Sequence, residues 1–488
     1  MSDRRTMIEC MFEPRHDAAA SVIDRIRAAS RAENRAAGAR LEAIGELDLL
    51  RLRACGERES WSTDTWDAIS AEVAAALHIS QGLASSYLNY SRAMRNRLPR
   101  IGAALSAGDI SYSTFQTIVY RTDLITDPEV MATVDAKLAT KVRQWPSMTR
   151  GRLGAAVDRV VAAADRDAVR RTSKQQADRE FSLWDTGNGL TEVFGRLVTT
   201  DARGVDARLN ALARTVCERD PRTVKQRRAD GLGALAAGAD RLKCRCGQPT
   251  CPAGTTPVPS PVVIHVVANQ STVDGSTPEP GAIIGTDVLV PAELIAQLAE
   301  SARLRPLVHP GDAPAERGYV PSQALADFVR CRDLTCRFPG CDHPATGSDL
   351  DHTIPHSQGG STHASNLKCL CRFHHLVKTF WGWRDRQLPD GTVIWTSPSG
   401  QTYVTAPGSA LLFPDLCAPT GEVASPVEPD RYTDRAAMMP RRRRTRANYR
   451  RDYIAAERRR NRNARELCAA ATQLTAPSRP PDGEPPPF

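Results

Sequence analysis

Apolar residues recur at helical spacing through the first third of the chain. In residues 20–53, isoleucine and leucine stand three or four positions apart among Arg, Glu and Ala, as on one face of a helix. Residues 66–120 predict further short helices with an interruption at Pro99, and residues 128–172 continue the helical pattern. Residues 71–94 predict two helices joined by a short turn. In such a pair the second helix can lie in the major groove of DNA, but most helix pairs only pack against the rest of their domain.

The periodicity changes after this helical part. Residues 179–198 have β-forming residues on both sides of a Gly-Asn-Gly turn, which predicts a hairpin. A short strand is expected within 262–268, after the Pro-rich stretch 252–261, and further strands within 380–405. These patterns predict an α+β protein with the following parts: a flexible N-terminus (1–19), a mainly helical domain with a mixed middle region (20–305), a linker (306–318), a domain with a β extension (319–410) and a disordered Arg- and Pro-rich tail (411–488).

Length and composition narrow the class of protein. The chain has 488 residues, of which 41% are apolar and 25% charged. This suggests roughly two to four globular domains and excludes a collagen, a silk or a wholly disordered chain. The first residues contain no apolar segment of the secretory kind, and no run approaches the ~18–20 apolar residues of a membrane helix. We therefore expect a cytoplasmic protein with no membrane partner and with reduced cysteines.

The basic charge is concentrated near the C-terminus. The formal net charge is +9, but residues 441–465 hold twelve Arg against one Asp and one Glu, so the remainder of the chain sums to −1. Such a run indicates either a polyanion partner, most often nucleic acid, or a solvated disordered end. Residues 317–386 carry only +3. The resulting hypothesis is that the Arg-rich tail supplies affinity for DNA.

The thirteen cysteines are clustered, and in a reducing cytosol clustered Cys mixed with His indicates a metal site. Cys336 and Cys341 form a Cys-x4-Cys pair across a Pro-Gly turn. Cys371 and His374 form a Cys-x2-His pair, one helical turn apart. Two such pairs complete a tetrahedral zinc site, whose metal would supply much of the folding energy of a small region. Cys369 could replace Cys371 as a ligand.

A second group of cysteines is less complete. Cys244, Cys246 and Cys251 supply three thiolates, one fewer than a closed zinc site needs. His265 is the nearest candidate for a fourth ligand, and the alternative is a loop that carries partly buried free thiols. Cys331 could be a spare thiol of the first group.

Further polar residues stand between and beside the ligands of the first group: Asp351, His352, Asn366 and His375. A carboxylate and an imidazole suit a divalent cation that must bind phosphate, and a second imidazole can act as a general base on water. Together they suit the hydrolysis of a phosphodiester. Asp351 and His352 are adjacent, so they can share a site only if their strand ends or twists there, and Pro355 is consistent with such an ending.

The order of these motifs resembles that of the HNH endonuclease family. Cys-x4-Cys, Asp-His, Gly-Gly-x-Thr, Asn-Leu and Cys-x2-His-His follow one another within about residues 320–382. The upstream helical region, the CRCGQPTC group and the FWGWRDRQLPDGTVIW extension resemble the 13E12 repeat family, in which a domain of unknown function 222 precedes an HNH domain. The resemblance implies a ββα-metal fold, supported by zinc, for the C-terminal domain.

The resemblance also implies roles for the candidate residues. His352 corresponds to the general base, and Asn366 to the residue that fixes the loop and orients that base. Asp351 and His375 correspond to ligands of a catalytic Mg²⁺, Mn²⁺ or other divalent cation. The structural zinc ligands would be Cys336, Cys341, Cys371 and His374. Because they are neighbours, His374 and His375 could exchange roles.

The implied activity is that of a hydrolase, a metal-dependent DNA endonuclease that nicks one strand or cuts both. The alternatives are a non-catalytic, zinc-containing nucleic-acid-binding protein and an accessory factor of a mobile element. Lys378 would either contact a backbone phosphate or be a solvated lysine at a helix end, and His356 and His363 are expected to be surface residues. No small-molecule cofactor is expected, and the resemblance leaves the oligomeric state open.

Overall fold

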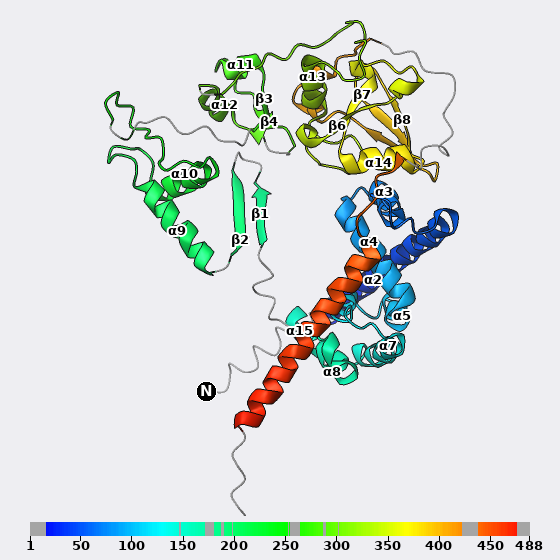
Figure 1. Ribbon diagram of the computed structural model, residues 1–488. Coiled ribbons are helices and arrows are strands. Elements are labelled where there is room, and N and C mark those ends of the chain that lie inside the picture. The colour runs from blue at the N-terminus through cyan, green and yellow to red at the C-terminus, as the bar shows by residue number, and fades with distance from the viewer. Residues whose placement is uncertain are drawn as a thin grey trace, which may run out of the picture. The chain divides into compact units, whose positions relative to one another are not determined.

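A computed structural model describes residues 16–145, 148–170, 180–186, 190–197, 199–251, 253, 264–285, 289–300, 302–421 and 438–475. By its contacts the chain divides into two compact units (Figure 1). The helical unit comprises residues 1–171, 376–383 and 431–488, and the mixed unit comprises residues 172–375 and 384–430. The protein is thus mixed α and β with a helical N-terminal region, and its two units interleave along the sequence.

Consecutive helices build the N-terminal part of the helical unit: α2 (His16–Cys55), α3 (Thr65–Leu77), α4 (Gln81–Asn96), α5 (Pro99–Ser106), α6 (Tyr112–Arg121), α7 (Pro128–Val142) and α8 (Arg150–Ala164). Ser80 and Ser111 precede α4 and α6, and each accepts a hydrogen bond from a backbone N–H of the first turn. Pro99 stands at the start of α5, where a helix tolerates proline because that N–H has no partner in the helix. Leu41, Ile101 and other buried apolar side chains form the core. The helical pattern of the sequence is confirmed here.

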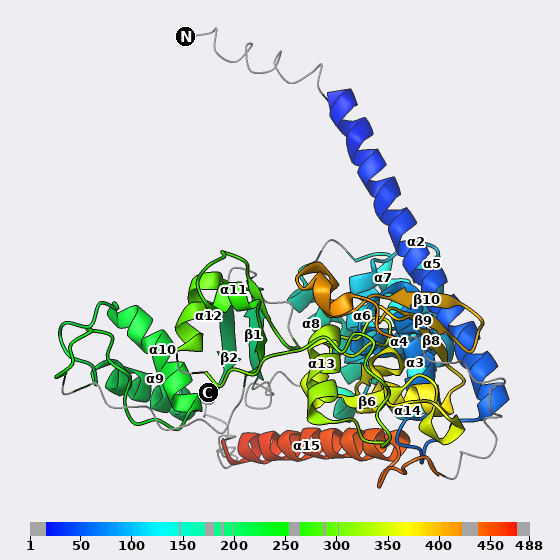
Figure 2. The same ribbon diagram turned by 90° about the horizontal axis from the view of Figure 1, so that it is seen from above.

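The N-terminal half of α2 extends away from this core (Figure 2). Ile23 and Ile26 are 47% and 59% exposed, whereas Leu41 and Ile44 in the second half are buried. Leu49 and Leu50 near the end of the helix are again exposed, at 36% and 61%, so only the middle of the apolar face is buried. The helix already begins at His16, so the predicted flexible N-terminus is wrong for residues 16–19, and residues 1–15 lie outside the described part.

Helices α3 and α4 form the predicted pair around the turn at residues 78–80. Leu88 of α4 is buried, and Arg92 and Arg95 on the same helix pair with the buried Asp48 at 2.7 and 2.8 Å. These two arginines are therefore engaged within the helical unit, and contact of α4 with DNA stays a prediction.

The Arg-rich segment contains a long helix instead of a disordered end. Helix α15 (Arg446–Thr475) lies along the helical unit (Figures 1 and 2), and Ile454 is buried in the core. Asn461, itself 5% exposed, donates from Nδ2 to the carbonyl oxygens of Asp167 and Val169 at 2.7 and 2.8 Å. The prediction of a disordered tail over 411–488 is therefore wrong for residues 446–475 and also for 411–421, where Phe413 and Thr420 are buried, while residues 422–437 and 476–488 lie outside the described part.

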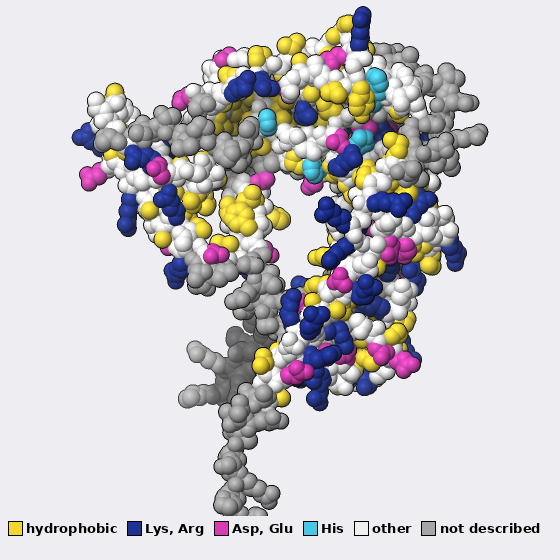
Figure 3. Space-filling model, in the orientation of Figure 1, with side chains coloured by type: hydrophobic (Ala, Val, Ile, Leu, Met, Phe, Trp, Pro, Cys, Tyr) yellow, Lys and Arg dark blue, Asp and Glu magenta, His cyan; other side chains and the backbone are white. Residues whose placement is uncertain are grey.

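Acidic side chains of the helical unit neutralise arginines of α15. Arg458 pairs with Asp165 at 2.6 Å, and Arg462 and Arg465 both pair with Asp167. Desolvation would by itself raise the pKa of Asp167, but the hydrogen bonds from Arg465 and Arg462 outweigh it and hold that pKa below its usual value. Figure 3 shows Lys and Arg side chains gathered over α15. The composition predicted disorder because like charges repel, and carboxylates remote in sequence relieve that repulsion.

The first part of the mixed unit contains two small antiparallel sheets. The predicted hairpin is confirmed as β1 (Glu180–Asp185) and β2 (Thr191–Arg196), with Glu180 opposite Arg196. The second sheet has the strand order β3-β4-β5. Its strands are β3 (Val266–Val267), β4 (Gly281–Ile283) and β5 (Leu289–Val290). The helices of this part are α9 (Thr199–Ala213), α10 (Val224–Ala236), α11 (Gln270–Val273) and α12 (Ala292–Ala299). The Pro-rich stretch 252–261 lies outside the described residues, apart from Ala253.

The second part of the mixed unit frames the candidate site. Its elements are α13 (Gln323–Asp333), η4 (Ala345–Gly347), β6 (Asp349–His352), η5 (His356–Gln358), η6 (Ala364–Asn366), β7 (Leu367–Leu370) and α14 (Arg372–Phe380), followed by β8 (Arg384–Gln387), β9 (Val393–Thr396) and β10 (Thr402–Thr405). Strands β6 and β7 pair antiparallel, with His352 opposite Leu367, and β8, β9 and β10 form the expected β extension. Phe328 and Val329 of α13 pack on Leu367 and Cys369 of β7.

Segments at both ends of this part are integrated into the fold. The predicted linker 306–318 packs on the mixed unit, because His309 places its ring edge-on to Phe328 at 5.1 Å and the N–H of Glu316 donates to Thr362 at 2.9 Å. Helix α14 belongs to the mixed unit through His375 and to the helical unit from residue 376 onward. No helix among the described residues combines the length and the apolar character needed to cross a membrane.

Candidate functional site

The predicted zinc ligands come together in the mixed unit. The ligand atoms of Cys336, Cys341, Cys371 and His374 all lie within 4.8 Å of one another. Nδ1 of His374 is 3.3 Å from Sγ of Cys371 and 3.7 Å from Sγ of Cys336. Three thiolates and one imidazole are a donor set that zinc takes in closed tetrahedral sites. The residues present therefore fit a structural zinc ion.

Local structure explains why these four side chains converge. Cys336 and Cys341 flank a turn in which Gly340 has a φ of 74°, a conformation that glycine adopts without strain. Cys371 follows β7 directly, and His374 lies in the first turn of α14. The ring of Phe338 stacks on the ring of His374 with centroids 4.1 Å apart, which holds the imidazole in place. Much of the cluster geometry is thus set by the turn, the strand end and this stacking contact.

Burial and hydrogen bonding shift the pKa values of the cluster thiols in opposite directions. Burial raises the pKa of Cys336, whereas hydrogen bonds from Cys336 and Cys341 hold the pKa of Cys371 far below its usual value. Cys369 is fully buried in the apolar core, and its Sγ lies 3.9 Å from the carbonyl oxygen of Val329. It therefore does not replace Cys371 in the cluster.

His352 ends β6 and is 6% exposed. Its Nε2 lies 3.0 Å from Oγ1 of Thr362, whose hydroxyl donates to the carbonyl oxygen of Gly318 at 2.6 Å. Since that hydroxyl has a single proton, Nε2 must donate to Oγ1, which makes Nδ1 the acceptor nitrogen of the neutral ring. Tyr319 stacks on the imidazole with centroids 5.3 Å apart and an interplanar angle of 18°. In the neutral ring the contact with Thr362 favours the tautomer whose proton is on Nε2 and whose lone pair is on Nδ1.

Asn366 ties together the loop that follows β6. Its Oδ1 accepts from the N–H of Ile354 at 2.8 Å, and its Nδ2 donates to the carbonyl oxygens of Ile354 and Ser361 at 3.1 and 2.8 Å. The side chain is 1% exposed. Because an amide both donates and accepts, it can bridge the two ends of this loop. Thr362 comes directly after Ser361, so the same bridge positions the hydroxyl that orients His352.

Asp351 and His375 face each other across β6 and α14. Oδ1 of Asp351 lies 3.3 Å from Nε2 of His375, and Nδ1 of the same ring lies 2.9 Å from Oδ2 of Asp349. Asp349 and Asp351 share one face of β6 because side chains alternate along a strand. Sequence reasoning missed Asp349, although its spacing of two from Asp351 was a usable signal.

Asp351 also has a buried cationic partner that was not predicted. Nζ of Lys368, a fully buried lysine opposite Asp351 on β7, is 2.6 Å from Oδ2 of Asp351 and 2.5 Å from Oδ2 of Asp385. Asp351 therefore contacts Lys368 and His375, whereas the adjacent His352 contacts Tyr319 and Thr362. The alternation of the strand sends the two neighbours to different sides, as expected from their adjacency, and the strand ends at His352.

Asp351 and His375 carry donor atoms of the kinds that divalent cations accept. Oδ1 of Asp351 and Nε2 of His375 lie side by side, and solvent reaches them because the side chain of His375 is 25% exposed. Two protein ligands leave the remaining coordination positions to water and phosphate oxygens, as Mg²⁺ sites commonly do. Asp349 on the other ring nitrogen would orient the imidazole, in the way carboxylates support metal-bound histidines. The residues are thus compatible with a divalent cation.

Three expectations about single residues change. His363 is buried, with Nδ1 2.7 Å from Oγ of Ser365 and Nε2 3.2 Å from the carbonyl oxygen of Ala313, so the prediction of a surface residue is wrong. His356 is half-buried and lies beside His352, with ring centroids 5.7 Å apart. Lys378 is 9% exposed, which excludes a solvated lysine at the helix end.

The second cysteine group is completed by a residue that the sequence did not suggest. Cys244, Cys246 and Cys251 lie with Cys217, and the four Sγ atoms are within 4.8 Å of one another. His265 is an exposed residue in the segment before β3 and is not part of this group, so it was the wrong candidate. Within the described residues, this cluster and the Cys336 cluster are the groups of three or more such side chains that could hold a metal ion.

Comparisons with known proteins identify the family. Two uncharacterized proteins of Mycobacterium tuberculosis, Rv2100 and Rv3776, are each 44% identical to the chain and cover 90% and 88% of it, and 87% of their own lengths. A third, the uncharacterized protein in est 3'region, is 39% identical over 63% of the chain and 95% of its own length. No solved structure matches. The domain of unknown function DUF222 matches residues 28–333, so the chain belongs to the DUF222 family.

Proposed function

We propose that the domain predicted over residues 319–410 is a metal-dependent endonuclease of the HNH type that hydrolyses phosphodiester bonds of DNA. One observation carries the proposal: β6 bears Asp351, which faces His375 of α14, and ends at His352, while the Cys3His cluster forms where β7 ends and α14 begins. The matched DUF222 range ends at Asp333, before these residues begin. The proposal therefore rests on the side chains themselves and on the order of motifs in the sequence.

His352 is suited to act as the general base. Its Nε2 is committed to Thr362, so Nδ1 is the nitrogen that takes a proton from water. The oxygen of that water then forms a bond to phosphorus, the bond from phosphorus to the leaving oxygen breaks, and the leaving oxygen takes a proton from solvent. Asn366 keeps the loop, and with it Thr362, in the position that holds this tautomer.

Asp351 and His375 are the residues that would hold the catalytic cation. A divalent cation held there would polarise the phosphate and stabilise charge on the leaving oxygen. Lys368 engages Oδ2 of Asp351, so Oδ1 is the oxygen that faces His375. Asp349 holds the His375 ring from its other nitrogen. The arrangement directs one carboxylate oxygen and one ring nitrogen to the same place.

Nicking of supercoiled plasmid DNA in Mg²⁺ or Mn²⁺ tests the proposal. We expect His352→Ala to slow cleavage at least ~100-fold, because a positioned general base contributes roughly 10²–10⁴-fold. His265→Ala is the matched control, since His265 is an exposed histidine of the same unit and lies outside the site. Circular dichroism of both variants checks that the fold is retained.

Equal cleavage by wild type and His352→Ala would contradict the proposal. Absence of cleavage by the wild type over varied metals and substrates would also contradict it. If that inactive protein still bound DNA, the non-catalytic zinc-containing nucleic-acid-binding protein would become the better description.

A further inference from the structure

We infer that Cys217, Cys244, Cys246 and Cys251 bind a second structural zinc ion, which joins the end of α9 to the segment that follows α10. This inference is independent of the proposed nuclease activity, because none of the four residues belongs to that site.

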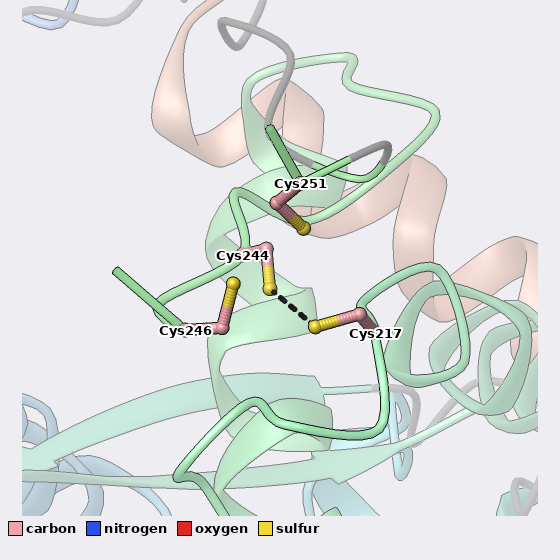
Figure 4. A group of neighbouring side chains, drawn as sticks. All are labelled: Cys217, Cys244, Cys246 and Cys251. Atoms are coloured by element: carbon pink, nitrogen blue, oxygen red, sulfur yellow. Dashed lines mark hydrogen bonds between the residues drawn. The ribbon is translucent and has the colours of Figure 1, made fainter. Parts of the chain in front are cut away.

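The four side chains converge from two separate segments (Figure 4). Cys217 comes from the loop after α9, and the other three come from residues 244–251 after α10, with their sulfur atoms turned toward one another. Sγ of Cys217 is 3.5 Å from Sγ of Cys244. Sulfurs on a tetrahedral zinc ion with bonds of ~2.3 Å stand about 3.8 Å apart. The separation is close to that spacing and well beyond a disulfide bond of about 2.05 Å.

A buried carboxylate holds the two segments together beside the cysteines. Asp220, whose side chain is fully buried, accepts from Arg222 at 2.8 Å and from the N–H of Arg245 at 2.9 Å. Arg222 in turn donates to the carbonyl oxygen of Lys243 at 2.8 Å. Hydrogen bonds from Arg222 hold the pKa of Asp220 well below its usual range. The loop that carries Cys217 is thus placed against residues 243–245 by contacts that do not involve the thiols.

The turn between the cysteines is built to bring them back together. Gly247 has a φ of 70°, which favours glycine, and the N–H of Cys251 donates to the carbonyl oxygen of Gln248 at 3.2 Å. This reversal places Cys251 on the same side as Cys244 and Cys246 within a short Cys-x-Cys-x4-Cys segment.

The surroundings favour zinc over four free thiols. A buried free cysteine behaves as a small apolar residue, but these four are only half-buried and face one another. The apolar core near them is small, and among the described residues of 199–253 its buried members are Leu209, Leu212, Ala213, Ala239, Leu242 and Ala253. In such small regions a metal supplies folding energy that the core lacks.

Charge and donor type define the role of the ion. Zinc with four thiolates carries a net charge of −2, and Arg219, Arg222, Arg241, Lys243 and Arg245 stand in the same two segments. Four thiolates also close the tetrahedron, leaving no open position for water or substrate, which is typical of structural zinc. The ion would therefore hold α9 and α10 in place and take no direct part in a reaction.

Metal content of the purified full-length chain tests the inference. We expect two zinc ions per chain in the wild type, one in Cys217→Ser, one in Cys371→Ser, and two in the control variants His265→Ala and Cys55→Ser. An unchanged zinc content in Cys217→Ser would overturn the assignment, as would a wild type whose whole zinc content is lost in Cys371→Ser.

A measurement on the wild type covers the case in which Cys217→Ser fails to fold. Alkylation with iodoacetamide, mapped by mass spectrometry, should leave Cys217, Cys244, Cys246 and Cys251 protected until zinc is removed with a chelator. Rapid modification of these thiols before chelation, or disulfide bonds among them after purification under reducing conditions, would overturn the inference. Neither readout depends on DNA cleavage, so a failed nuclease assay leaves it unaffected.

Discussion

Replacing Asn366 with alanine probes the loop that positions the candidate general base. The substitution removes one accepted and two donated hydrogen bonds, which link Asn366 to Ile354 and Ser361 at 2.8–3.1 Å. Asn366 is 1% exposed, so the groups left behind have restricted access to water. The perturbation is therefore one of hydrogen bonding at a buried position.

The size of the effect follows from the number of bonds. A hydrogen bond contributes about 1 kcal/mol net, and an unsatisfied buried group costs about 1–3 kcal/mol. Three lost bonds at about 1 kcal/mol each weaken loop closure by about 3 kcal/mol, which is a factor of ~100 in the opening equilibrium.

Hydrogen exchange of the backbone measures this directly. The N–H of Ile354 donates to Asn366, so its exchange should be about 100-fold faster in Asn366→Ala if protection follows local opening. Asn366→Asp is the matched variant, because a carboxylate can still accept from Ile354 but can no longer donate to Ser361. In Asn366→Asp we expect the Ile354 amide to exchange more slowly than in Asn366→Ala. We also expect plasmid nicking by Asn366→Asp to stay below the wild-type rate.

Unchanged exchange at Ile354 in Asn366→Ala would refute the assigned hydrogen bonds. Faster exchange spread evenly over the whole mixed unit would refute the local role, since it would report general destabilisation.

Two further predictions test other contacts. Thr362→Val should lower cleavage ~10–100-fold and alter the pH profile of the rate, because His352 loses the hydroxyl that its Nε2 contacts. Thr362→Ser keeps that hydroxyl and should retain most of the activity. Equal cleavage rates for the two variants would contradict this role of Thr362. Because α15 lowers the pKa of Asp167, its ion pairs should stabilise the helical unit above about pH 4 and lose this contribution as pH falls through the lowered value. The stability difference between wild type and Asp167→Asn, measured by urea unfolding, should therefore shrink in acid, and a difference independent of pH would contradict the ion pairs.

Short-range patterns carried the correct sequence predictions. Helical spacing identified the N-terminal helices, and the Gly-Asn-Gly turn identified the β1–β2 hairpin, because both depend on residues close in sequence. The ligands of the Cys336 cluster follow from two local pairs, Cys336–Cys341 and Cys371–His374. Choosing Cys371 over Cys369 needed the structure, since strand β7 points Cys369 into the apolar core.

Contacts between distant segments were beyond the sequence. Cys217 lies 27 residues before Cys244, and no local motif links the two. The Arg-rich segment gave a composition typical of disorder, but α15 folds because Ile454 enters the core and because carboxylates nearly 300 residues earlier neutralise its arginines. Lys368 joins the site only through its position opposite Asp351 on the paired strand.

The sequence alone therefore predicted the candidate residues of the two proposed sites: the clustered thiols, the imidazoles and the Asp351–His352 pair with Asn366. Their types and short spacings limit the ions and reactions they can serve. The tertiary structure decided which of them meet, that Nε2 of His352 contacts Thr362, and that Cys217 completes the second cluster. The physical reason is that ligand convergence, tautomer choice and charge neutralisation depend on separations in space, which chain closure and packing set over long stretches of sequence.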